Sequence, residues 1–356
     1  MLRKVLQTLC VVAIALGAMA LAHDFHDVLN GEPHCGTPVI SERDADQVDQ
    51  IVARFKSIIC NNAEPGTVRI CEDVHVRATK FDPITIPVNW HVFYDSATGG
   101  GMNVTTEMID HQTDIMNEDF AGLNPGGPGG YHSTSFRFEV ANVNFVDHSN
   151  WFHNMIAREK IYKKQLANST DTHLNMYVGE MRGGVLGMCY FAFMYPADSH
   201  MHGCLIHHSS MVGGGQTNYD NGQTCTHEVG HHIGLYHVWQ AKCSERSDRV
   251  EDTPPQKTNS RGCPSPVPES CTPGLYDNIH NFMDYSDDIC RWEFSAGQSQ
   301  RADEIITVFH PGYLSHAERS AIRVAADRAG LADAWAEAGR FQSRFAAREA
   351  EWTQFL

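Results

Sequence analysis

Residues 227–237 read His-Glu-Val-Gly-His-His-Ile-Gly-Leu-Tyr-His, and they predict a metal site at the centre of the fold. His227 and His231 are four residues apart, so on a helix they share one face and can bind one ion. Gly234 can end that helix, because glycine adopts the left-handed backbone conformation at low cost, and His237 can then turn back to the same ion. Three neutral imidazoles leave a fourth position for water, which is the geometry of a catalytic zinc site.

Two simpler interpretations of this motif stay open on the sequence alone. A solvated histidine-rich helix could give the same spacing in a chain with 21 histidines. A structural zinc site is the second, but such sites usually have four protein ligands, often cysteines. Glu228 follows the first histidine, where it can act as a general base on a water molecule at the metal. A later segment, Asn281-Phe-Met-Asp-Tyr-Ser286, offers Met283 as an apolar floor beneath the histidines, so the two motifs together favour a catalytic site.

Length and charge limit the kinds of protein this chain can be. With 356 residues and 42% hydrophobic content, it can form one sizeable catalytic domain with flanking segments. The formal net charge is −16, and no block of basic residues interrupts the acidic sequence. Because phosphate repels an acidic surface, we expect no nucleic-acid partner.

The N-terminus has the pattern of a secretory signal peptide. Arg3 and Lys4 precede an apolar run from Val5 to Leu21, and Ala20-Leu-Ala22 is a small-x-small cleavage site. A membrane anchor is the alternative, although the run is short for a span. The pattern therefore predicts a secreted, extracellular protein that begins near His23 and does not contact the membrane after signal removal.

Cysteines and glycosylation triplets agree with secretion. The chain has 11 cysteines, and removal of Cys10 with the signal leaves an even number, which we expect to be mostly disulfide-bonded. Asn103 and Asn168 each begin an acceptor triplet for N-glycosylation, which makes a glycoprotein the expectation.

Changes of composition divide the chain into a signal peptide (1–22), a polar propeptide-like segment (23–82), a catalytic domain (83–310) and a helical tail (311–356). Residues 240–275 are rich in Pro, Ser, Cys and Asp, which indicates an irregular segment held by disulfides. The periodicity predicts strands at 84–94, 135–146, 173–180, 186–193 and 203–209, helices at 46–59, 105–120, 156–166, 297–309 and from about 223, and an apolar stripe in the tail at Ile322, Leu331, Trp335, Phe341 and Phe345.

These motifs resemble the pappalysin family of metzincin metalloproteases, especially its secreted microbial members. The resemblance covers roughly residues 83–309 and rests on four segments. It implies an α+β, metzincin-like fold, in which a twisted mixed sheet and an active-site helix lie above an irregular, disulfide-bonded C-terminal subdomain. The segments are His227 to His237, Asn281-Phe-Met-Asp-Tyr-Ser-Asp-Asp-Ile-Cys290, Phe294-Ser-Ala-Gly-Gln-Ser-Gln-Arg301 and Asn150-Trp-Phe152.

The resemblance also implies a disulfide pairing in the lower subdomain. Matched position by position, Cys243 would pair with Cys271, and Cys263 with Cys290. Spacing alone allows three pairings of these four cysteines.

The mechanism that the motifs imply is hydrolysis of a peptide bond by zinc-activated water, with Glu228 as the general base. Related metzincins place a tyrosine two residues after the Met-turn methionine near the metal, which gives Tyr285 either that role or simple packing. In this fold the substrate adds as an antiparallel strand to the upper sheet edge, for which the sequence suggests residues 204–209. Proteins or peptides are thus the expected partners.

Two further sites rest on the resemblance and on acidic residues. In relatives, an aspartate at the position of Asp288 lies at the base of the primed-side pocket and favours Arg or Lys; a solvated or calcium-binding aspartate is the alternative. Asp248, Glu251, Asp252 and Thr253 form an oxygen-rich cluster of the kind that binds Ca²⁺, unless this is only a charged loop.

Cys35, in His-Cys-Gly-Thr ahead of the domain, could hold the protein latent. Its thiolate can occupy the fourth zinc position and exclude water, and release would then follow cleavage near Arg77 or Lys80. The alternative is a disulfide with one of five other cysteines. These are Cys60, Cys71, Cys189, Cys204 and Cys225.

Three functions remain to be distinguished. The first is a secreted zinc endopeptidase. The second is a secreted binding or adhesion protein that keeps the scaffold without activity, which the intact Glu228 argues against. The third is a peptidase of another metzincin family, which the cysteines and the context of Met283 argue against.

Overall fold

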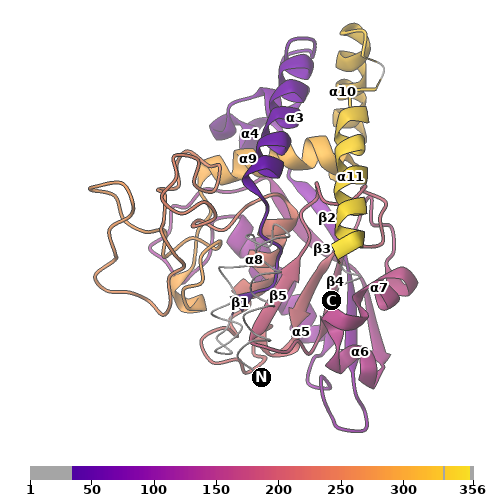
Figure 1. The fold of residues 1–356 in the computed structure, drawn as a ribbon, viewed down its shortest axis with the longest axis vertical. Coiled ribbons are helices and arrows are strands. Elements are labelled where there is room, and N and C mark those ends of the chain that lie inside the picture. The colour runs from indigo at the N-terminus through magenta and orange to yellow at the C-terminus, as the bar shows by residue number, and fades with distance from the viewer. Residues whose placement is uncertain (1–33, 332, 353–356) are drawn as a thin grey trace, which may run out of the picture.

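A twisted six-stranded mixed sheet forms the centre of the molecule, for which a computed structural model describes residues 34–331 and 333–352 (Figure 1). The strand order is β1-β5-β6-β4-β2-β3, and every neighbouring pair is parallel except β5 with β6. The strands are β1 (His34–Cys35), β2 (Ile84–Tyr94), β3 (Phe136–Asp147), β4 (Leu174–Gly179), β5 (Val185–Cys189) and β6 (Cys204–His207).

Helices cover both faces of the sheet. Alternate residues of a strand face opposite sides. Phe93 of β2 packs on Tyr162 of α7 (Met155–Leu166), which follows the short helix α6 (Ser149–His153). Phe138 of β3 lies beside Ile86 of β2 and packs on Phe120 of α5 (Thr106–Phe120). Since Ile86 and Phe93 have opposite parity along β2, α5 and α7 lie on opposite faces. The helix α8 (Gln223–His232) packs against α5 and β5.

The segment before the domain packs with the C-terminal tail as a helical layer. The helix α3 (Glu42–Cys60) is capped by Ser41, whose side chain accepts a hydrogen bond from the Asp44 backbone N–H. Its apolar face is buried against α9 (Ala296–Phe309) and α10 (His316–Arg328), and Phe55 packs on Trp335. The other elements of this layer are the 3₁₀ turn η2 (Arg69–Cys71), α4 (Val74–Lys80) and α11 (Ala336–Trp352).

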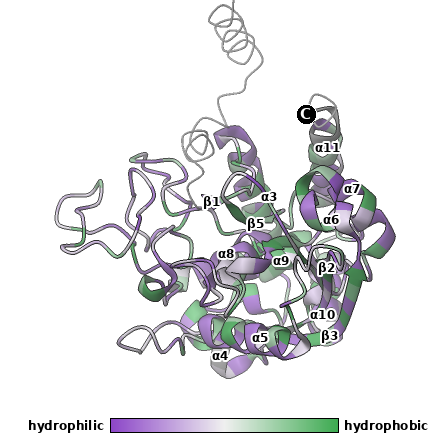
Figure 2. Cartoon of the chain, turned by 90° about the horizontal axis from the view of Figure 1, so that it is seen from below, coloured by the Kyte–Doolittle hydropathy of each residue, from purple (hydrophilic) through white to green (hydrophobic). Residues whose placement is uncertain are grey.

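Residues 240–275 are irregular, as predicted, and the irregular segment continues to residue 295 apart from the 3₁₀ turn η4 (Asp288–Cys290). In Figure 1 they form the orange loops at the left, and Figure 2 shows the loops on that side as mainly hydrophilic or neutral. Its sequence has few periodic apolar runs of the kind that form helices or strands. Two disulfides, Cys243–Cys271 and Cys263–Cys290, cross-link it instead, which is the pairing that the resemblance implied.

The predicted elements are present, with three differences. The strand expected at 186–193 ends at Cys189, because the aromatic residues that follow form a buried turn, in which Phe191 packs on His231. The segment 204–209 is not the edge of the sheet, because β6 lies between β4 and β5. In the tail, Leu331 is 37% exposed, so it does not belong to the apolar stripe.

Other predictions concern the surface and the N-terminus. Asn103 and Asn168 are both accessible at the surface, as glycosylation requires. The signal peptide lies outside the described residues. Within residues 34–331 and 333–352, no helix combines the length and the apolar character that a membrane crossing needs.

Candidate active site

The helix α8 carries His227 and His231 one turn apart and is buried along its whole length. Just beyond it the chain turns at Gly234, whose φ is +102°. A Cβ at this position would lie 2.6 Å from the Ile305 side chain, so the backbone angle and the packing both require glycine. The turn returns His237 to the two helical histidines, as predicted.

The three histidines form a triangle that fits a zinc ion. Their Nε2 atoms are 3.1 Å (His227–His231), 3.1 Å (His231–His237) and 3.2 Å (His227–His237) apart. A tetrahedral ion with bonds of about 2.05 Å separates its ligands by about 3.3 Å. The Nδ1 atoms of His227 and His231 lie 2.7 and 2.8 Å from the carbonyl oxygens of Phe282 and Leu235. Since carbonyls only accept, Nδ1 carries the proton and the Nε2 lone pair faces the centre.

Burial keeps these imidazoles neutral, as metal ligands must be. It lowers the pKa of His231 to about 3 and the pKa values of His227 and His237 well below the ordinary histidine value. The adjacent His232 points elsewhere, because its Nε2 lies 2.9 Å from the hydroxyl of Tyr313. Of the four histidines in residues 227–237, three therefore converge on one point, and His232 packs away from them.

Met283 packs against α8. It is fully buried, and a Cβ on Gly230 would lie 2.5 Å from its sulfur. The Asp284 carboxylate fixes this turn by accepting hydrogen bonds from the backbone N–H groups of Ser260 (2.9 Å) and Tyr285 (2.8 Å). Met283 thus has the position of the apolar floor that the sequence predicted.

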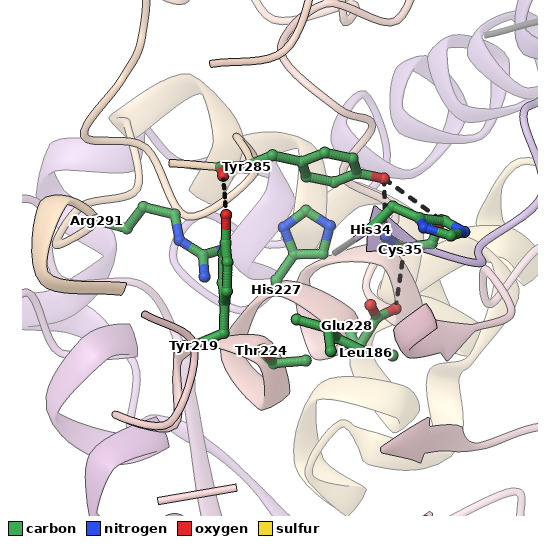
Figure 3. Close-up of a pocket in the computed structure, with 10 residues that line it drawn as sticks. His34, Cys35, Leu186, Tyr219, Thr224, His227, Glu228, Tyr285 and Arg291 are labelled. Atoms are coloured by element: carbon green, nitrogen blue, oxygen red, sulfur yellow. Dashed lines mark hydrogen bonds between the residues drawn. The ribbon is translucent and has the colours of Figure 1, made fainter. Parts of the chain in front are cut away.

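Glu228 points from α8 toward strands β5 and β1 (Figure 3). The Thr37 hydroxyl and the Cys35 thiol donate hydrogen bonds to its Oε2, at 3.0 and 3.4 Å. Burial raises the pKa of Glu228 to about 8, against the lowering effect of these two bonds. A Cβ on Gly187 of β5 would lie 2.5 Å from the Glu228 side chain. The sequence reasoning missed Gly187 and Thr37; the only signal was a glycine inside an apolar strand.

Cys35 lies against the histidine triangle. Its sulfur and the ligand nitrogens of His227, His231 and His237 all lie within 4.8 Å of one another, and its side chain is buried. Strand β1 holds it there by pairing with β5, where the Gly36 N–H donates to the Gly187 carbonyl at 2.7 Å. Burial, then the nearby carboxylate of Glu228, raises the pKa of the Cys35 thiol.

The remaining cysteines leave Cys35 without a disulfide. Cys60 pairs with Cys71, and Cys189 pairs with Cys204. Among the described residues the free cysteines are Cys35 and Cys225, both buried. The alternative prediction, that Cys35 forms a disulfide, is therefore wrong.

Tyr285 lies over the same site. Its ring centroid is 5.7 Å from that of His227 and 5.1 Å from that of His237. The Cys35 backbone N–H donates to its hydroxyl at 3.0 Å, so the phenol reaches the strand that lies across the site.

Asp288 lies behind the pocket wall, not on it. It is 2% exposed, its Oδ1 pairs with Arg291, and its Oδ2 accepts from the Asn221 N–H at 3.0 Å. The residue that reaches the pocket is Arg291, together with Tyr219 and Thr224 (Figure 3). The sequence reasoning missed Arg291, although a basic residue three positions after an acidic one is a common ion-pair spacing.

The predicted calcium residues separate into two groups. Asp248 is buried, accepts from the Thr253 hydroxyl at 2.7 Å through Oδ1, and leaves Oδ2 without a partner among the described residues. Burial raises the pKa of Asp248 to about 7. Asp252 instead accepts from the Ser295 hydroxyl at 2.6 Å and caps α9, and Glu251 is exposed.

Comparison with known proteins shows to which family the chain belongs. The model of a peptidase family described as "Pregnancy-associated plasma protein-A" matches residues 157–307. An extracellular metalloprotease of Sordaria macrospora is 37% identical over 221 residues, 61% of this chain and 73% of that protein. One from Podospora anserina is 33% identical over 278 residues, 77% of this chain and 89% of the relative.

Two solved structures of mirolysin from Tannerella forsythia share the fold. Mature mirolysin, in complex with a cleaved peptide, is 26% identical, with a TM-score of 0.57 over 69% of this chain and 98% of its own. A point mutant of promirolysin is 22% identical and has a TM-score of 0.61 over 82% of this chain and 98% of its own.

The fold and the three-histidine site define a metalloprotease of the metzincin type. The chain belongs to the pappalysin family of that class, with extracellular fungal metalloproteases among its relatives.

Proposed function

We propose that the chain is a secreted zinc endopeptidase in which Glu228 is the general base. The convergence of three Nε2 atoms at 3.1–3.2 Å, with a carboxylate on the next residue, carries this proposal. Secretion rests on the extracellular relatives and on the signal-like N-terminus. The intact glutamate argues against the alternative, an inactive binding protein on the same scaffold.

The residues of the site divide the chemistry between them. Zinc held by His227, His231 and His237 would lower the pKa of water toward about 7 and polarise the scissile carbonyl. Glu228 takes a proton from the attacking water and delivers it to the leaving amine. The Tyr285 hydroxyl, once strand β1 has left, donates to the oxygen that gains charge during attack.

The substrate adds to the sheet at β5. Without β1, β5 is the edge strand, and its N–H and C=O groups can pair with an extended peptide. The family resemblance implies an antiparallel peptide, whereas β1 pairs with β5 in parallel. The N-terminal segment therefore occupies the cleft in the direction opposite to a substrate, which keeps its own peptide bonds out of register for cleavage.

Cys35 keeps the precursor latent in this proposal. Its sulfur lies where a fourth zinc ligand would lie, and its thiol and Thr37 both bond to Glu228. A soft thiolate is a strong zinc ligand and excludes water from the metal. One residue thus blocks the metal and the base together.

Release requires cleavage of the segment 23–82. Arg77 is buried in α4, where it pairs with Asp303 at 2.7 Å, so a protease cannot reach it before α4 unfolds. Lys80 is exposed at the end of the same helix. We therefore place the first cut at or beyond Lys80 and not at Arg77.

Calcium is proposed for Asp248 and Thr253 alone. A buried carboxylate with one unpartnered oxygen, beside a hydroxyl, suits a cation with oxygen ligands. Asp252 is left out, because it caps α9.

A preference for Arg or Lys on the primed side requires a free carboxylate at Asp288. Since Asp288 is paired with Arg291, a basic substrate side chain has to displace that arginine. A basic preference therefore depends on the separation of Arg291 from Asp288.

The Glu228→Gln variant tests the function. We expect it to bind zinc, measured by elemental analysis, but to lose casein cleavage by at least about 100-fold, because the amide cannot accept the proton. Glu107→Gln, an exposed change on α5, is the matched control and should stay active. Cleavage by the Glu228→Gln variant at the wild-type rate would refute the role of the base, and chelator-resistant cleavage would refute the role of zinc.

A further inference from the structure

A buried arginine forms part of the pocket next to the zinc site. Arg291 is 4% exposed, yet it lines the same pocket as Leu186, Thr224 and Glu228. In Figure 3 its guanidinium points toward Tyr219. Its positive charge is close enough to lower the pKa of Glu228, against the larger effect of burial. The pocket therefore has a fixed cation in its wall.

The Nε of this guanidinium is a donor that remains available to a ligand. Nη1 donates to the Asp284 carbonyl at 3.2 Å, and Nη2 pairs with the Asp288 carboxylate. Its Nε is buried and has no partner among the described residues. A buried donor without a partner is costly, and a ligand with an acceptor atom removes that cost.

The Asp288 carboxylate cannot attract a Lys or Arg side chain of the substrate while it is paired with Arg291. Arg291 and the Asn221 N–H engage both of its carboxylate oxygens, and Asp288 is not part of the pocket lining. A Lys or Arg side chain entering the pocket would meet Arg291 first, and like charges repel. A Glu or Gln side chain would present an acceptor to Nε.

The direction of strand β5 determines which substrate residue enters the pocket. The pocket is lined by Leu186 and Gly187, near the start of β5. A peptide antiparallel to β5 places its C-terminal half at that end, so the pocket receives the residue that follows the scissile bond.

We propose that Arg291 determines specificity, and that the enzyme prefers Glu or Gln directly after the scissile bond. This inference rests on the proposed endopeptidase function and names the substrate class of the same site. Arg291 contacts the substrate side chain; it does not take part in the proton transfers.

The test uses secreted, matured protein and five otherwise identical fluorogenic peptides. They carry Glu, Gln, Leu, Lys or Arg after a single cleavage point, which mass spectrometry locates. We expect kcat/KM for Glu and Gln to exceed that for Lys and Arg at least tenfold. Equal rates, or faster cleavage before Lys or Arg, would overturn the proposal while leaving the peptidase function intact. If no peptide and no casein is cleaved, both proposals fail.

Two variants assign the preference to this side chain. Arg291→Met keeps the length, removes the donor and frees Asp288, so we expect the order to reverse toward Lys and Arg. Because that change leaves Asp288 buried without its partner, the double variant Arg291→Met/Asp288→Asn removes both charges together and should prefer Leu. The control Arg261→Met removes a half-buried arginine that lies over the Tyr285 ring, 5.1 Å from its centroid, and should keep the wild-type order. An unchanged order in the double variant would overturn the assignment.

Discussion

A methyl group on Gly187 should inactivate the enzyme without removing its metal. A Cβ built there lies 2.5 Å from Cγ and Oε1 of Glu228, whereas ordinary contact begins at 3.4 Å. The carboxylate in Gly187→Ala must therefore move by about 0.9 Å, and a misplacement of about 1 Å can cost about 100-fold in rate. We thus expect kcat/KM to fall about 100-fold, which corresponds to about 2.7 kcal/mol of transition-state stabilisation.

The assay separates this effect from unfolding and metal loss. Peptide cleavage, zinc content and Tm are measured on the same preparation, and zinc should stay at the wild-type level because the three histidines do not change. Gly339→Ala is the control, since a Cβ there meets nothing within 4 Å. A kcat/KM within threefold of wild type would contradict the claim that the glycine positions Glu228. Loss of zinc would show that the strand supports the metal site instead.

Three further predictions concern the floor, the latent state and the lower subdomain. Gly230→Ala places a methyl group 2.5 Å from the Met283 sulfur. We therefore expect the free energy of unfolding, measured in urea, to fall by about 1–3 kcal/mol and zinc to be retained less well. An unchanged free energy of unfolding would mean that Met283 moves aside without cost. Cys35→Ala should make the secreted precursor cleave peptides before maturation, while Cys225→Ala, at the other buried free cysteine, should stay latent; equal latency of the two would exclude the thiol as the inhibitor. Calcium should raise the Tm of the wild type and not of Asp248→Asn, and an equal rise in both would place the ion elsewhere.

The sequence was sufficient wherever function depends on local spacing. His227 and His231 converge because a helix repeats every 3.6 residues, and Gly234 turns the chain because only glycine accepts its positive φ without strain. Strands and helices with strong periodicity were also predictable, since their patterns record which side is buried. The stretch at 186–193 was misjudged because an apolar run looks the same in a buried strand and in a buried turn.

Contacts between distant segments were not predictable in the same way. The sequence suggested that Asp288 determines specificity, but in the structure Asp288 pairs with Arg291 and does not line the pocket. The sheet edge was misassigned because the order of strands depends on long-range pairing, which no local pattern encodes. Cys35 could be counted as unpaired only after Cys60–Cys71 and Cys189–Cys204 were known.

The sequence by itself therefore predicted the convergence of the three histidines and the glutamate beside them, because these lie within eleven residues whose geometry a helix and one turn dictate. It also indicated the family, through four short segments of residues. The tertiary structure alone decided what surrounds the histidines and the glutamate. It brings Gly187 against Glu228, Cys35 against the histidines and Arg291 into the pocket wall, across sequence separations that only the packing of the whole sheet and its helices can close.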